Sequence, residues 1–138
     1  MGTKKNKSGN LLMRFSGKKV LLAENSLISA VHAESILKHW NLKIDVVRNG
    51  KEAVHKVKDS HYDIVLLTIQ MPEMDGLETA KQIRLMGYNL KDLPILALTA
   101  RTISMDVLSL NGINDIILKP FSVEDLESKF DLYLHNDF

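Results

Sequence analysis

The 138-residue sequence contains no cysteine, which excludes disulfide bonds and metal sites built on thiolates. It has no apolar run near the roughly 20 residues of a membrane span, and no secretory apolar segment near its start. Its 18 Lys and Arg residues nearly balance 17 Asp and Glu residues, so the chain carries no strong field toward nucleic acid or a membrane surface. We therefore expect a cytoplasmic protein whose partners include neither nucleic acid, for this domain alone, nor a membrane.

The length and composition are those of one globular domain, with 45% hydrophobic and 25% charged residues. Residues 1–18 differ from the rest because several lysines stand among Gly and Ser. We expect residues 1–18 to form a flexible basic lead, either a solvated tail or an arm for an anionic partner, and residues 19–135 to form the domain. The lead also contains four apolar residues, and the sequence leaves open whether they pack locally or against another chain. They are Leu11, Leu12, Met13 and Phe15.

Five short apolar runs alternate with five segments of helical periodicity. The runs are too apolar for burial on one face only, which predicts an α/β fold with a parallel sheet and helices on both faces. The predicted strands are 20–23, 44–47, 64–68, 94–99 and 116–118, and the predicted helices are about 27–40, 50–60, 77–86, 102–110 and 123–134.

Helical spacing also predicts which side chains face the core. For the first helix the inward set is Leu27, Ala30, Val31, Ala33, Leu37 and Trp40, and for the last helix it is Val123, Leu126, Phe130 and Leu134. The five histidines are scattered along the chain, which favours surface positions over a metal site.

The third predicted strand is the most informative segment. A continuous apolar run, 64–67, ends on Thr68, and Pro72 and Gly76 then break the strand. Ligands of open α/β sheets bind just past the carboxyl ends of strands. Thr68 therefore stands where chemistry is expected.

The segment Met71-Pro72-Glu73-Met74-Asp75-Gly76 resembles the sequence that follows the phosphoacceptor aspartate in response-regulator receiver domains. The aspartate position itself holds Thr68. The resemblance extends over about residues 18–134 and implies a doubly wound, flavodoxin-like sheet in the order 2-1-3-4-5.

Three further segments match the same family. Glu24 stands at the first position of the family's acidic pair, and Asn25 replaces the second acid. Thr99 with Ala100 matches its hydroxyl-Ala step, and Lys119-Pro120-Phe121 matches its Lys-Pro step, where the family implies a cis bond. Ile116 occupies a switch position that is often aromatic. The resemblance thus implies one pocket that contains Glu24, Asn25, Thr68, Thr99 and Lys119.

These departures predict a degenerate phosphorylation pocket. An alcohol cannot form an acyl phosphate, and a neutral threonine without a base is a poor phosphoryl acceptor. Two negative charges are missing, at positions 25 and 68, so we expect weak or absent binding of Mg²⁺, no other cofactor and no metal site. We also hypothesise that Lys119 pairs with Glu24 and fills the space of a phosphate and metal.

The resemblance implies a signalling module of a two-component phosphorelay rather than an enzyme. We expect a pseudo-receiver that binds a histidine kinase, a phosphotransfer protein or an output domain through residues 102–135, with a homodimer through that face as a further possibility. The aliphatic Ile116 favours a fixed surface over a switched one. Two alternatives stay open: a conventional Mg²⁺-dependent phosphate-accepting receiver and a flavodoxin-like binder of a small molecule.

Overall fold

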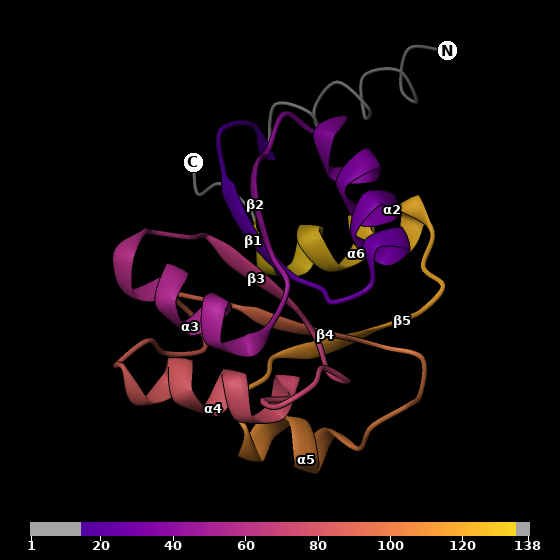
Figure 1. Cartoon of the computed structure of the whole chain (residues 1–138). Coiled ribbons are helices and arrows are strands. Elements are labelled where there is room, and N and C mark those ends of the chain that lie inside the picture. The colour runs from indigo at the N-terminus through magenta and orange to yellow at the C-terminus, as the bar shows by residue number, and fades with distance from the viewer. Residues whose placement is uncertain (1–14, 135–138) are drawn as a thin grey trace, which may run out of the picture.

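The computed structural model describes residues 15–134, which form one five-stranded parallel sheet with helices on both faces (Figure 1). The strand order is β2-β1-β3-β4-β5, which confirms the predicted topology. The strands are β1 Lys19–Ala23, β2 Lys43–Val47, β3 Ile64–Thr68, β4 Ile95–Thr99 and β5 Asp115–Leu118, and the helices are α2 Leu27–Lys38, α3 Gly50–Asp59, α4 Gly76–Leu85, α5 Met105–Leu110 and α6 Val123–Tyr133.

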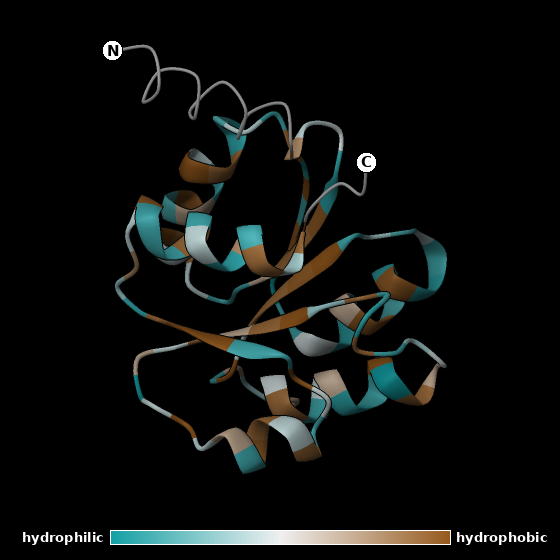
Figure 2. Ribbon diagram, turned by 180° about the vertical axis from the view of Figure 1, so that it is seen from behind, coloured by the Kyte–Doolittle hydropathy of each residue, from teal (hydrophilic) through white to brown (hydrophobic). Residues whose placement is uncertain are grey.

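Side chains of the strands contribute to two separate cores, because successive side chains point to opposite faces of a sheet. In β1, Val20 and Leu22 join the core under α2 and α6, whereas Leu21 and Ala23 join the core under α3, α4 and α5. All five residues of β3 and of β4 are buried, as expected for central strands covered on both sides. Figure 2 shows these strands as hydrophobic ribbons between more polar helices.

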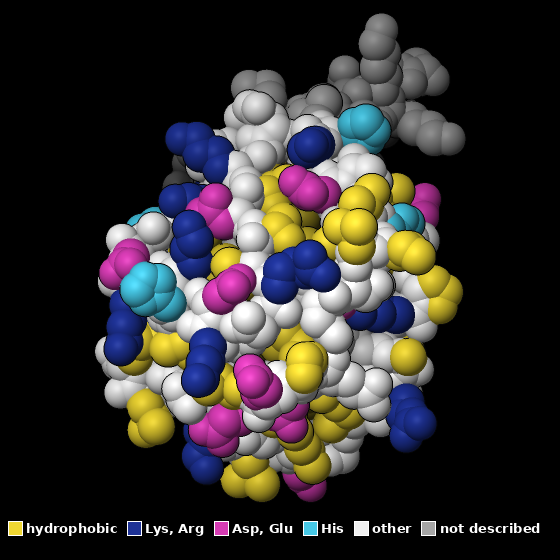
Figure 3. Space-filling view, in the orientation of Figure 1, with side chains coloured by type: hydrophobic (Ala, Val, Ile, Leu, Met, Phe, Trp, Pro, Cys, Tyr) yellow, Lys and Arg dark blue, Asp and Glu magenta, His cyan; other side chains and the backbone are white. Residues whose placement is uncertain are grey.

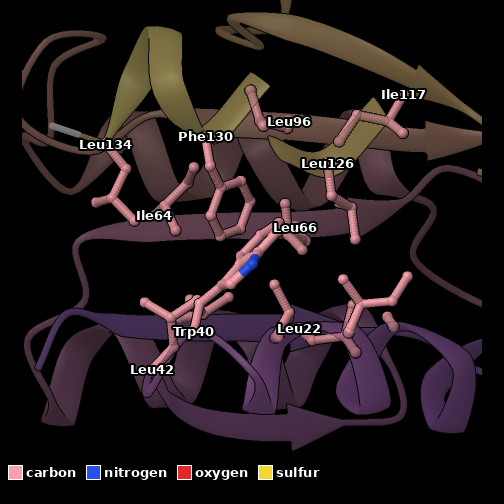
Figure 4. Close-up of a cluster of buried hydrophobic side chains, with 14 of the residues drawn as sticks. Leu22, Trp40, Leu42, Ile64, Leu66, Leu96, Ile117, Leu126, Phe130 and Leu134 are labelled. Atoms are coloured by element: carbon pink, nitrogen blue, oxygen red, sulfur yellow. The ribbon is translucent and has the colours of Figure 1, made fainter. Parts of the chain in front are cut away.

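The core under α2 and α6 is built around aromatic rings, of which Figure 4 shows Trp40 and Phe130 close together. Phe15 completes this group, with its ring centroid 5.5 Å from that of Trp40 and 5.9 Å from that of Phe130. Phe15 is fully buried, so this residue of the predicted lead packs locally, which is one of the two alternatives that the sequence left open. Residues 1–14, with Leu11, Leu12 and Met13, lie outside the described residues.

Polar side chains begin each helix at the expected kind of position. Ser26 and Ser122 are the N-caps of α2 and α6, because their side chains accept hydrogen bonds from the backbone of the first turn of each helix. Asp75, from the Met-Asp-Gly segment, caps α4. The predicted helix 102–110 is shorter than expected, because the cap is Ser104 and α5 begins at Met105.

The predicted inward faces of two helices are partly wrong. In α2, Ala30, Ala33 and Leu37 are buried, but Leu27 and Val31 are 64% and 56% exposed. Val123 of α6 is likewise 46% exposed. The N-terminal half of α2 has apolar residues on several sides, so spacing alone allowed more than one buried face. Packing against the sheet selects the side with the two small alanines.

The amino ends of the strands hold no part of the candidate pocket. Asp63 precedes β3 and its carboxylate accepts a hydrogen bond from the backbone N–H of Lys19, 2.8 Å away, where β1 begins. Asp63 therefore lies at the opposite end of β3 from Thr68. Within residues 15–134, every helix is too short or too polar to span a membrane.

Candidate functional site at the carboxyl ends of the strands

The register of the sheet places the predicted pocket residues together at the carboxyl ends of neighbouring strands. Ala23 pairs with Leu67, so the next residues along the two strands, Glu24 and Thr68, emerge side by side. Thr99, the last residue of β4, pairs with Leu118, the last residue of β5. Lys119 is the next residue after Leu118 and so emerges at the same end of the sheet. The loops enclose a cleft of about 220 Å³. Its lining consists of Glu24, Asn25, Ser26, Thr68, Gln70, Leu98, Thr99, Ala100 and Lys119.

A closed hydrogen-bond network occupies the floor of this cleft. Lys119 Nζ lies 2.5 Å from Glu24 Oε1 and 3.3 Å from Thr68 Oγ1. The Thr68 hydroxyl donates to the same Glu24 Oε1 at 2.5 Å. Glu24 is only 1% exposed, so its charge is neutralised within the protein rather than by solvent. The hypothesis that Lys119 pairs with Glu24 is confirmed.

The second oxygen of Glu24 is also engaged. Its Oε2 accepts a hydrogen bond from the backbone N–H of Ser26 at 3.0 Å. In the orientation that satisfies its hydrogen bonds, the Asn25 amide donates to the carbonyl oxygen of Gln70 at 3.2 Å and to Glu24 Oε2 at 3.3 Å. Asn25 therefore acts as a donor toward the carboxylate, whereas an acid at this position would repel it.

Thr99 and Ile116 occupy more peripheral positions. Thr99 Oγ1 accepts a hydrogen bond from the backbone N–H of Arg101 at 3.2 Å and lines the cleft without joining the Glu24 network. Ile116 is paired with Ala97 in the sheet and packs, half-buried, against the core under α3, α4 and α5. The Lys119–Pro120 peptide bond is cis, as the resemblance implied.

The donor set does not fit a divalent cation of the Mg²⁺ type. Mg²⁺ requires several hard oxygen ligands in near-octahedral geometry. The cleft offers one carboxylate, and both of its oxygens already accept hydrogen bonds, one of them from an ammonium group. A metal ion at Glu24 Oε1 would face the positive charge of Lys119 at contact distance.

Comparison with known proteins agrees with this architecture. The fold, with polar strand-end segments around one cleft, is of the doubly wound, flavodoxin-like class. The model of the response regulator receiver domain family matches residues 20–131. The chain belongs to this family, and it is a receiver domain of two-component signal transduction.

In individual curated relatives, the matched segment is a small part of a larger protein. The aerobic respiration control sensor protein ArcB of Escherichia coli is 38% identical over 109 residues, which is 78% of this chain and 14% of ArcB. Hybrid signal transduction histidine kinase K of Dictyostelium discoideum is 34% identical over 126 residues, which is 86% of this chain and 10% of that kinase. The chain thus spans about one tenth to one fifth of the first curated relatives.

Two solved structures are similar in both sequence and fold. The receiver domain of the Pseudomonas aeruginosa sensor histidine kinase PA1611, with a magnesium ion coordinated in its active site cleft, is 27% identical, with a TM-score of 0.77 over 86% of this chain and 98% of that one. The receiver domain of Saccharomyces cerevisiae Ssk1, in complex with the phosphotransfer protein Ypd1, is 28% identical, with a TM-score of 0.75 over 86% of this chain and 90% of that one.

Two features of the site were not predicted from the sequence. The backbone groups of Ser26 and Gln70 take part in the Glu24 and Asn25 hydrogen bonds, and backbone roles leave no trace in residue type. The exposed Leu27, Ile28 and Val31 of α2 begin one residue after the cleft-lining Ser26. Their apolar type was visible in the sequence, but their exposure was not.

Proposed function

We propose that this receiver domain is a pseudo-receiver, a protein-interaction module that works without phosphorylation and catalyses no reaction of its own. The observation that carries the proposal is the contact between Lys119 Nζ and Glu24 Oε1 at 2.5 Å, with Thr68 bonded to the same oxygen. This network satisfies the groups that would otherwise receive a metal ion and a phosphoryl group.

The chemistry of Thr68 supports the same proposal. Its hydroxyl proton is directed at Glu24, and the side chain is 4% exposed. Glu24 is the nearest candidate base, but both of its carboxylate oxygens already accept hydrogen bonds, one from the backbone of Ser26 and the other from Lys119 and from Thr68 itself. Phosphoryl transfer to a hydroxyl needs a positioned base and cationic groups that neutralise the transferred phosphoryl group.

We infer that the partner surface is an apolar patch on α2, formed by Leu27, Ile28 and Val31. These side chains are 64%, 84% and 56% exposed, and Figure 3 shows hydrophobic side chains at the surface over α2. Exposed apolar side chains that cluster on one helix favour a protein partner. A phosphotransfer protein or a histidine kinase suits this patch, since the related Ssk1 receiver forms a complex with Ypd1.

The segment 102–135, which was predicted to form the partner face, also carries exposed apolar side chains. Met105, Leu110 and Leu132 are 53%, 82% and 61% exposed there. These side chains are distributed over two helices, α5 and α6, rather than gathered within one turn. We assign this face to a homodimer or an output domain. The strand-end cleft does not favour the flavodoxin-like binder, because its volume of about 220 Å³ is small beside typical ligand pockets of roughly 300–1,000 Å³.

The direct test of the proposal is incubation of the chain with a small-molecule phosphodonor and Mg²⁺, followed by intact-mass analysis. We expect no added phosphoryl group on the wild-type chain. Thr68→Asp is the matched comparison, because it restores a carboxylate at the acceptor position and should gain a base-labile phosphoryl adduct. An acid-stable, base-labile adduct on the wild-type chain would establish the conventional receiver instead.

The partner surface is tested with paired variants of similar exposure. With purified Ypd1 as the probe, Ile28→Glu should weaken binding at least tenfold in titration calorimetry, whereas Leu132→Glu should leave it within twofold. Light scattering measures the mass of the chain in solution, which shows whether the chain dimerises and whether Leu132→Glu separates the subunits. Loss of Ypd1 binding in Leu132→Glu alone would move the partner surface to the 102–135 face.

A further inference from the structure

We propose that the open edge of β2, together with the groove beside it, binds an acidic, extended segment of a partner protein, which adds to the five-stranded sheet as a further strand. The segment carries aliphatic and acidic side chains in alternation. The β2 edge consists of residues other than the α2 patch, and its use requires neither the presence nor the absence of phosphorylation. The inference therefore goes beyond the proposed function.

The backbone of β2 has groups that face away from the sheet. In the strand order β2-β1-β3-β4-β5, β2 pairs with β1 alone. The N–H of Lys43 donates to, and the carbonyl oxygen of Val47 accepts from, backbone groups at the two ends of β1, so residues 43, 45 and 47 face β1. The N–H and C=O groups of Ile44 and Val46 consequently point outward, and no strand within residues 15–134 pairs with them.

A groove of about 370 Å³ lies beside this edge, between β2 and α3. Its volume is within the roughly 300–1,000 Å³ that is typical of ligand sites. Alternate side chains of a strand point to the same face of a sheet, so every second side chain of an added strand would enter the groove. Aliphatic side chains suit the valines of its wall. The lining consists of Val46, Val47, Lys51, Glu52, His55 and Lys56.

The charges around the groove favour an acidic segment. Residues 43–58 contain five Lys or Arg residues and two acids, and Figure 3 shows positively charged and His side chains at the surface over α3. Both acids are engaged, because Asp45 accepts a hydrogen bond from a tyrosine hydroxyl at 2.6 Å and Glu52 accepts one from the backbone just before α3 at 3.0 Å. Lys51 and Lys56 form no ion pair with any residue of 15–134, so they remain available to an acidic partner.

The same charges disfavour a second copy of this chain as the occupant. Two β2 edges that pair about a twofold axis would bring the lysines of both α3 helices toward each other, and like charges repel. A short edge strand with charged side chains is also a common protection against pairing between identical edges. The five-residue β2 has this character, with Lys43 and Asp45 among its residues.

The first experiment follows amide hydrogen exchange by NMR in the full chain, with a synthetic peptide of alternating glutamate and valine residues as the probe. The amides of Ile44 and Val46 should exchange quickly in the free chain, whereas β1 protects those of Asp45 and Val47. Saturating peptide should slow exchange at Ile44 and Val46 at least tenfold and leave Asp45 and Val47 within twofold. This alternation distinguishes strand addition from electrostatic adsorption of the peptide beside α3.

The second experiment measures binding of the labelled peptide by fluorescence anisotropy at 0.15 M salt. A peptide with N-methyl groups on its two central residues keeps every charge but loses one N–H that faces β2, and it should bind at least tenfold more weakly. Lys51→Glu/Lys56→Glu should weaken binding of the unmethylated peptide at least tenfold. Lys81→Glu/Lys91→Glu changes the net charge equally at exposed positions that do not line the groove, and should leave binding within twofold.

Three results would each overturn the inference: unchanged exchange at Ile44 and Val46, equal binding of the methylated peptide, or equal losses in the two double variants. Protection of Ile44 and Val46 without peptide, with a doubled mass in light scattering, would assign the edge to a second copy instead. Displacement of the peptide by an equal concentration of a single-stranded oligonucleotide would reduce the groove to a general polyanion site. No phosphodonor is present and the α2 patch is intact in every variant, so each of these outcomes leaves the proposed function standing.

Discussion

Lys119 Nζ and Glu24 Oε1 lie 2.5 Å apart although 95 positions separate the two residues in sequence. Glu24 follows β1 and Lys119 follows β5, and β3 and β4 lie between these strands in the sheet. The contact therefore ties together segments that the sheet itself does not join.

Loss of the Glu24 charge should lower the stability of the whole domain. Glu24→Gln leaves the Lys119 ammonium group, whose side chain is 20% exposed, without its counter-ion, and we expect a loss of about 3 kcal/mol in the free energy of unfolding. Urea denaturation measures this change. Glu124→Gln, on the exposed first turn of α6, is the matched control and should change stability by about 0.5 kcal/mol or less. Equal effects of the two substitutions would show that the ion pair contributes no stability.

Removal of the Thr68 hydroxyl should cost less. Thr68→Val keeps the shape of the side chain but removes the hydrogen bond to Glu24 Oε1, so we expect a loss of about 1–2 kcal/mol. Thr102→Val, at an exposed position, is the control. The double variant Glu24→Gln/Thr68→Val should lose less than the sum of the single losses, since the two groups share one network. Strict additivity would mean that the hydroxyl and the carboxylate act independently.

Arg84 should be hard to replace even by lysine. Its guanidinium donates to the carbonyl oxygens of Leu93 at 2.7 Å and Gly112 at 2.8 Å and to Asn114 Oδ1 at 2.9 Å. Burial lowers the pKa of Arg84 to about 10, so the group remains charged at neutral pH.

Arg84→Lys cannot reproduce this fork of donors and should cost about 2 kcal/mol in urea denaturation. Lys81→Arg, on an exposed part of the same helix, is the control, and the prediction fails if both variants unfold together.

Asp115 should make stability depend on acid pH. Burial by itself raises the pKa of Asp115, but hydrogen bonds from the backbone of Ile116 and from Lys129 and Tyr133, together with the Lys129 charge, leave the pKa below its usual 3.8. A carboxyl group with a depressed pKa stabilises the folded state above the unfolded pKa and loses that contribution as the pH falls through the folded value.

Asp115→Asn should therefore be less stable than the wild-type chain at pH 7 by about 1–2 kcal/mol, and the difference should shrink as the pH falls below about 4. Urea denaturation at pH 7, 5 and 3 measures this difference. Burial, and in second place the Asp115 carboxylate, raise the pKa of Tyr133 to about 12. A difference that is constant with pH would contradict the assignment.

Phe15 should behave as a core residue. It is fully buried beside Trp40 and Phe130, so Phe15→Ala should cost about 3–5 kcal/mol and leave a cavity against the indole ring. Trp40 is the single tryptophan of the chain, and its fluorescence reports the change directly. An unchanged midpoint of unfolding and an unchanged emission maximum would place Phe15 outside the core.

The strand-end segments explain why so much of the fold was predictable. Continuous apolar runs and the alternation of two periodicities required a parallel sheet covered on both faces. The resemblance of the Met-Pro and Lys-Pro segments to receiver domains then implied the strand order, and the register brought Glu24, Thr68 and Lys119 together as expected. The buried side of α2 and the burial of Phe15 were less predictable, because they depend on which elements pack against these residues.

Local chemistry was determined by the sequence alone. An alcohol at position 68 cannot form the bond that a carboxylate forms, whatever surrounds it, and the apolar runs require burial in any fold. The tertiary structure decided which groups meet. Lys119 neutralises Glu24, and Leu27 and Val31 remain exposed, because distances between residues remote in sequence depend on how the elements pack. Burial and pairing are properties of the assembled core, and no single segment of the chain contains them.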